Sequence, residues 1–106
     1  MNILPPQKEK ALTIEDIKQQ VAGFYHVKVA DLNSSRRDKY IAHPRHVAMY
    51  LCRELLNLSL PAIGREFGGR DHTTVMHGCE KISTALKKDP NLAEDVTNIR
   101  KHLSNG

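Results

Sequence analysis

The run GGRDHTTVMHG, residues 68–78, gathers hydrogen-bonding side chains at a point where a helix is expected to begin. Asp71 can accept a hydrogen bond from an exocyclic amine, and His72 can donate one to an acceptor atom. Thr73 offers both a hydroxyl and a methyl group. These are the groups that distinguish base edges in the major groove of DNA, including the methyl group of thymine.

The same residues also have a purely structural interpretation. Asp71 is a good helix N-cap, and Gly68–Gly69 is an ordinary helix stop. Thr74 and His77, together with the free N–H groups of the helix start, can hold phosphate, although threonine is also harmless early in a helix. The residues alone therefore leave two possibilities open: a helix that reads DNA, and a helix that only folds.

The flanking sequence predicts the elements that position this run. Ser59 can cap a short helix with Pro61 in its first turn, and Gly68–Gly69 ends it by taking up the left-handed conformation of a tight turn. A longer helix then begins near Asp71. Its buried stripe is expected at Val75, Cys79, Ile82 and Leu86. This is the helix-turn-helix pattern, in which the second helix enters the major groove. Gly64 would let the first of the two helices lie close to its partner.

Apolar spacing predicts helices on both sides of this pair. One begins at the cap Thr13, with a stripe at Ile14, Ile17, Val21 and Phe24. Residues 27–32 form either a short strand or, as favoured here, a helical turn from Ala30 to Leu32. A helix with Pro44 in its first turn runs to about Leu58, with Val47, Leu51, Leu55 and Leu58 as its buried face.

After Pro90 closes the second motif helix, a capping-box-like start at Asn91 and Glu94 predicts a final helix. Its apolar face is formed by Leu92, Val96, Ile99 and Leu103. We therefore predict an all-α fold, a compact helical bundle containing a helix-turn-helix. Residues 1–11 are expected to be a flexible tail or linker, and residues 12–106 a single DNA-binding domain.

Composition sets wider limits. The 106 residues carry 16 Lys and Arg against 12 Asp and Glu, for a net charge of +4, which permits an anionic partner without demanding one. Cys52 and Cys79 lie within apolar helical patterns and are interpreted as buried, reduced thiols. The N-terminus has no apolar signal-peptide core, and no run is long enough to span a membrane. A cytoplasmic protein is therefore expected, and one associated with the nucleoid if it binds DNA.

A second candidate site is the basic segment of residues 34–46, for which we predict a loop. The segment contains a single acidic residue, Asp38, and four basic residues, Arg36, Arg37, Lys39 and Arg45. A basic segment beside a helix-turn-helix can act as a minor-groove arm, to which arginine is well suited. The alternative is a loop whose charges are simply solvated.

These residues together resemble a known family. The run GGRDHTTVMHGCEKI (68–82) resembles the C-terminal signature of the bacterial replication initiator DnaA. The segments TIEDIKQQVAGFY, VKVADL, RRDK and HPRHVAMYLCRELLNLSLPAIGREFGG resemble the rest of its DNA-binding domain, domain IV. The resemblance covers about residues 12–106.

The resemblance implies binding of double-stranded DNA at short, asymmetric, A·T-rich DnaA boxes of the replication origin. It implies base contacts by Asp71, His72 and Thr73 in the major groove and by Arg37 in the minor groove. The implied backbone contacts are Lys39, Arg45, His46, Arg53, Asn57, Leu60, Pro61, Arg70, Thr74 and His77.

The chain departs from the family pattern at a few positions. His43 and His46 stand where the family often has arginine and glutamine, and Asp38 places a negative charge inside the basic segment. These departures bear on individual phosphate contacts and on whether Arg36 or Arg37 enters the minor groove.

Full-length initiators carry a separate ATPase module and meet other protomers through domains absent here. The sequence contains no GxxxxGK[ST] loop, so no cofactor is expected in this chain. The proline-containing N-terminal tail favours an excised domain over a free-standing relative.

The sequence also offers alternatives to DNA-box binding. His72, His77 and Cys79, or His43 and His46, could suggest a metal site, but Cys79 lies on the apolar stripe and the basic segment would repel a cation. No pair of nucleophile and base is spaced for catalysis, so an enzyme is not expected. A helical protein-interaction module and a helix-turn-helix transcription regulator remain the alternatives.

Overall fold

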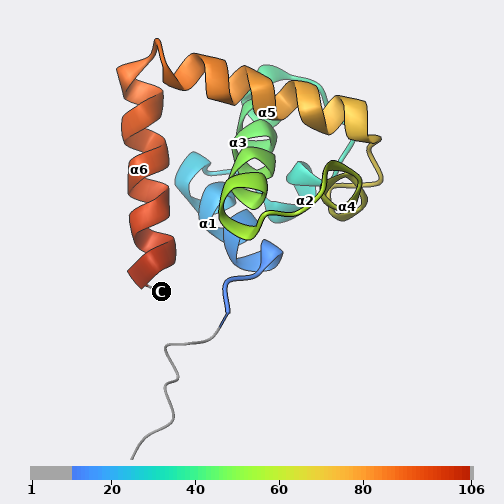
Figure 1. The fold of residues 1–106 in the computed structure, drawn as a ribbon, viewed down its shortest axis with the longest axis horizontal. Helices are drawn as coiled ribbons and strands as arrows, with labels where there is room; N and C mark the ends of the chain where they lie inside the picture. The colour runs from blue at the N-terminus through green and yellow to red at the C-terminus, as the bar shows by residue number, and fades with distance from the viewer. Residues whose placement is uncertain (1–10, 106) are drawn as a thin grey trace, which may run out of the picture.

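The computed structural model describes residues 11–105, so the predicted tail of residues 1–11 lies almost entirely outside the described part of the chain. The described residues form six helices and contain no strand, which confirms the predicted all-α class (Figure 1). The helices are α1 (Ile14–Tyr25), α2 (Val29–Leu32), α3 (Lys39–Leu56), α4 (Leu60–Glu66), α5 (His72–Leu86) and α6 (Pro90–Asn105).

Helix α3 is the centre of the fold. It contacts α1, α2, α4 and α5, while α6 packs against α1 and the far end of α5. In Figure 1, α5 crosses the top of the molecule in front of α3, and α6 turns down beside α1. Aliphatic side chains from all six helices form the core, and Phe67, which follows α4, is its one fully buried aromatic ring.

Several predicted boundaries are confirmed. The Thr13 hydroxyl accepts from the main-chain N–H of Asp16 at 3.1 Å, and the Asp16 carboxylate accepts from that of Thr13 at 3.0 Å, which is a complete capping box. Residues 29–32 form the favoured helical turn rather than a strand. Ser59 caps α4, because its hydroxyl accepts from the N–H of Ala62 at 3.2 Å.

The predicted loop over residues 34–46 is wrong beyond Asp38. Helix α3 begins at Lys39, so Pro44 lies inside it rather than in its first turn. The main-chain N–H groups of Ile41 and Ala42 already bond to the Asp38 carbonyl at 2.9 and 2.8 Å. Burial of Ile41 extends the apolar face of α3 toward its N-terminus, and one proline this early removes only one helical bond. The helix also ends two residues before Leu58, at Leu56, because Asn57 takes up a left-handed conformation with φ of 55°.

The predicted start of the last helix is also wrong. Pro90 is the first residue of α6 and does not merely close the preceding helix. The Asp89 carboxylate accepts from the N–H groups of Asn91 and Leu92 at 3.0 and 3.3 Å, so the cap comes from Asp89 and not from Asn91. Proline has no N–H to satisfy and its φ suits a first helical position, which explains the earlier start.

Candidate nucleic-acid interface

Helices α4 and α5 and the turn between them form the predicted helix-turn-helix. The turn passes through Gly68 and Gly69, whose φ angles are +86° and +77°. It then folds back onto α4, where the N–H of Arg70 donates to the Gly64 carbonyl at 2.9 Å. A Cβ on Gly64 would lie only 2.0 Å from the Arg70 carbonyl oxygen. This confirms that glycine at position 64 allows the close approach.

The first turn of α5 presents its polar side chains to solvent. Asp71, His72, Thr73 and Thr74 are all exposed, and so is His77 one turn later, whereas Val75 on the opposite side is fully buried. The Asp71 carboxylate accepts from the Thr74 N–H at 2.8 Å, which caps α5 and lowers the pKa of Asp71 below its ordinary value. The structure therefore brings all five predicted side chains of this helix to one exposed end.

Arg36 and Arg37, neighbours in the basic segment, differ in their contacts. Arg36 donates to both carboxylate oxygens of Asp38, at 3.3 and 3.1 Å, and lies 3.9 Å from Asp31. Arg37 takes part in no ion pair within residues 11–105 and borders a hollow in the surface. Lys39, at the start of α3, is also exposed. Arg37 is therefore the arginine of this pair that is available to a ligand.

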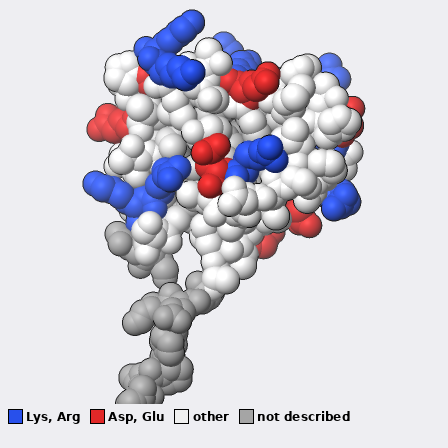
Figure 2. Space-filling model, in the orientation of Figure 1, with Lys and Arg blue, Asp and Glu red and all other residues white. Residues whose placement is uncertain are grey.

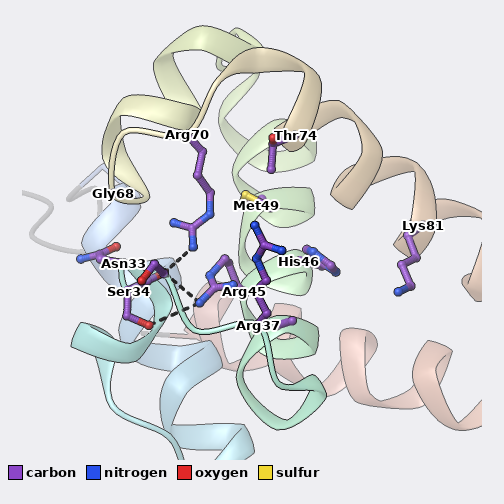
Figure 3. A pocket seen from close by; sticks show the side chains of 12 residues that line it. Asn33, Ser34, Arg37, Arg45, His46, Met49, Gly68, Arg70, Thr74 and Lys81 are labelled. Carbon is purple, nitrogen blue, oxygen red and sulfur yellow. Dashed lines mark hydrogen bonds between the residues drawn. The ribbon is translucent and has the colours of Figure 1, made fainter.

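The hollow lies between the segment that precedes α3 and the underside of α5 (Figure 3). Its volume is about 590 Å³. The residues around it are Asn33, Ser34, Ser35, Arg37, Ala42, Arg45, His46, Met49, Gly68, Arg70, Thr74 and Lys81. Four of these side chains are cationic and none is acidic, so the hollow suits an anion. The face seen in Figure 2, by contrast, carries charges of both signs among large uncharged areas.

Arg45 borders the hollow but is almost fully buried. Its exposed fraction is only 4%, and its guanidinium donates to the carbonyls of Leu32 at 3.0 Å, Asp31 at 3.1 Å and Ser34 at 3.0 Å. Burial, and then the neighbouring charge of Arg70, lowers its pKa from the usual value. Three hydrogen bonds of Arg45 therefore go to the main chain through Nε and Nη2, and a contact of this residue with the DNA backbone stays a prediction.

His46 and Arg70 border the hollow with their polar groups partly covered. Burial, reinforced by Lys81 and Arg45, lowers the pKa of His46 to about 4, so the imidazole is neutral at physiological pH. Arg70 donates to the carbonyls of Phe67 and Ser34, as Figure 3 shows for Ser34. Both residues border the hollow, where His46 is uncharged and Arg70 is held by two main-chain carbonyls.

The remaining predicted backbone contacts gather elsewhere. Arg53, Asn57, Leu60 and Pro61 lie where α3 ends and α4 begins, and none of them borders the hollow. The Arg53 guanidinium donates to the Leu58 carbonyl at 2.9 Å and remains exposed. Helix α4 starts there with its cap at Ser59, so these four residues form a second group apart from the hollow.

Sequence reasoning missed Lys81. It is an exposed residue of α5 and lies at the edge of the hollow (Figure 3). The signal was present, because Lys81 follows His77 by four residues and so shares its side of the helix. It also missed Lys18, a side chain of α1 that is only 2% exposed.

The cysteines and histidines show no metal-binding arrangement within residues 11–105, where no three His, Cys, Asp or Glu side chains are grouped to hold an ion. Both cysteines are free, Cys52 buried and Cys79 half-buried. Burial raises the pKa of Cys52 to about 12. The described helices include none with the length and apolarity needed to cross a bilayer.

Comparison with known proteins identifies a matching family and a similar solved structure. A family model described as the bacterial dnaA protein helix-turn-helix matches residues 14–82. A crystal structure of a DNA replication initiation factor is similar over 93% of this chain, with a TM-score of 0.74 and 33% sequence identity. The match covers 30% of that longer chain, so the present chain spans less than a third of its length.

Proposed function

The chain belongs to the bacterial DnaA helix-turn-helix family, a family of DNA-binding domains in replication initiation, and from this premise we propose that it recognises DnaA boxes in double-stranded DNA. These boxes are short, asymmetric and A·T-rich. In this proposal α5 enters the major groove and Arg37 the adjacent minor groove. The chain would serve the initiation and regulation of chromosome replication at the origin.

The observation that carries the proposal is the exposed polar start of α5. His72 and Thr73 follow a turn that only glycine adopts without strain, and Val75 fastens the opposite side of the helix to the core. A helix held in this way can insert its first turn into the major groove without unpacking. Asp71, His72 and Thr73 then offer an acceptor, a donor and a combined hydroxyl and methyl group to base edges.

The cationic hollow supports the same docking. It separates Arg37 from the start of α5, so a DNA strand that passes between the two would lie against it. In this arrangement Lys39, Arg70, Thr74, His77 and Lys81 contact phosphates, and His46 contributes as a neutral imidazole. Arg53, Asn57, Leu60 and Pro61 hold a second stretch of backbone, with Leu60 and Pro61 acting mainly through main-chain and apolar contact.

Other properties of full-length initiators concern parts beyond this chain. We propose that ATP binding and contacts with other protomers belong to those parts, since this chain covers only 30% of the matched initiation factor. In this proposal the domain itself recognises the DNA sequence and catalyses no reaction.

Fluorescence anisotropy with labelled duplexes tests the proposal. A DnaA box and a scrambled duplex of equal composition are titrated at several salt concentrations. We expect tighter binding to the box, with both affinities falling steeply as salt rises because counterions are released. Equal affinity for the two duplexes would contradict box recognition, and binding insensitive to salt would point to a protein-interaction module.

A further inference from the structure

The turn of the helix-turn-helix touches the segment of residues 32–34 through its main chain. A Cβ on Gly68 would lie 2.3 Å from the Asn33 carbonyl oxygen and 3.2 Å from the Asn33 carbonyl carbon. Residue 33 is only four positions before Arg37, and residue 68 is four positions before His72. This main-chain contact therefore lies close to both places assigned to DNA reading.

Two cations bridge this contact, Arg70 from the turn and Lys18 from α1. Arg70 donates to the Phe67 carbonyl within the turn and to the Ser34 carbonyl across it. The Lys18 ammonium donates to the Asn33 side-chain oxygen at 2.9 Å and to the Glu66 carbonyl at the end of α4. It also lies 4.5 Å from the centre of the Phe67 ring.

Arg45 holds the same segment from α3. Its Nε donates to the Leu32 carbonyl, and its Nη2 donates to the carbonyls of Asp31 and Ser34. The Ser34 carbonyl thus receives both Arg45 and Arg70, as Figure 3 shows. The planar fork of arginine can serve several acceptors at fixed angles, which the single ammonium of lysine cannot do.

We propose that Lys18, Arg45 and Arg70 are positioning residues that set the distance between Arg37 and the start of α5. This inference rests on the proposed function, because it assigns Arg37 and α5 to the same DNA site. All three cations bind neutral carbonyl or amide oxygens rather than carboxylates. They therefore order the segment while their own positive charges remain outside any ion pair within residues 11–105. Ordering in advance reduces the conformational entropy that binding would otherwise cost.

The first test needs no DNA. Amide hydrogen exchange is measured by NMR at Ser34 and Arg36, whose N–H groups donate to the Asp31 carbonyl and the Ser34 hydroxyl. The wild type is compared with Arg45→Lys and Arg70→Lys, with Val96→Ala as a control on α6. Each lysine variant keeps the charge but loses charge-assisted bonds to the segment, so exchange there is expected to rise about tenfold or more. The control lies away from the segment and should leave these amides unchanged.

The second test is a double-mutant cycle between Arg37→Ala and Arg45→Lys, with DnaA-box affinity as the readout. If Arg45 acts through Arg37, the double variant should bind within about twofold of Arg37→Ala alone. A merely structural role would weaken the box and a scrambled duplex alike and add to the Arg37 loss.

The outcomes separate the two proposals. Faster exchange with non-additive affinity losses supports positioning. Unchanged exchange, or additive affinity losses in the two variants, overturns the positioning role. If the wild type still prefers the box, the proposed function stands. A wild type without any box preference overturns the proposed function and, with it, the role in DNA reading.

Discussion

Alanine substitutions at Gly68 and Gly69 separate backbone strain from close packing at the turn. Both glycines have positive φ, at +86° and +77°. An added Cβ meets nothing within 4 Å at Gly69, but at Gly68 it meets the Asn33 carbonyl oxygen at 2.3 Å. Alanine therefore has the same cost of a left-handed backbone at both sites, but only at Gly68 does it also clash with another part of the main chain.

The magnitudes follow from these two terms. A left-handed conformation costs an alanine about 1–2 kcal/mol, and the loss of unfolded-state entropy returns about 0.4–1 kcal/mol. Gly69→Ala is therefore expected to lower the free energy of unfolding by about 1 kcal/mol. Gly68→Ala carries the same cost plus an overpacking term of about 1–3 kcal/mol, since neither main chain can move away independently.

Urea denaturation followed by circular dichroism measures both variants against the wild type. The expected difference between them, about 1–3 kcal/mol, is large within a domain stability of about 5–15 kcal/mol. Equal losses for the two variants would refute the close contact between the turn and Asn33. Gly23→Ala is a control: it has a negative φ and open space, and is expected to stabilise α1 by about 0.5–1 kcal/mol.

Three further predictions concern charge. Arg37→Lys should lose much of the box affinity that Arg37→Ala loses, because lysine is more strongly hydrated; affinity restored by lysine would instead indicate a phosphate contact. Lys81→Ala should lower the salt slope of binding by about one unit, and equal slopes for Lys81→Ala and the control Lys88→Ala would contradict its place at the DNA. The free energy of unfolding should fall as pH drops from 6.5 toward 4, because His46 takes up a proton in the unfolded chain but not in the folded one, where its pKa is about 4. His46→Gln should show a weaker dependence of stability on pH. The same dependence as in the wild type would exclude His46 as the cause.

The sequence was sufficient to predict the helices and the polar start of α5, because each rests on local signals. Caps at Thr13, Ser59 and Asp71 lie within three residues of the N–H groups they satisfy. Pro44 was misleading for the opposite reason. Its cost to α3 is local, but burial of Ile41 against the rest of the molecule outweighs it.

Roles that depend on distant partners were not accessible in this way. Arg45 looks like a solvated charge in sequence, yet its acceptors lie 11 to 14 residues away along the chain. Lys18 bonds to a carbonyl 48 residues away. The charge of a residue indicates what it can bind, whereas the folded main chain decides which acceptors it meets.

The central claim is that the first turn of α5 reads bases, and a matched pair of threonines tests it most directly. Thr73 and Thr84 are both exposed on α5, at its start and near its end. The ratio of affinities for the DnaA box and for boxes changed at single base pairs is measured for Thr73→Ala and Thr84→Ala at one salt concentration. Thr73→Ala should lose about 1–3 kcal/mol on the box and relax discrimination at one position, while Thr84→Ala behaves as the wild type. Full discrimination retained by Thr73→Ala, and by His72→Ala measured alongside it, would contradict base reading by this helix.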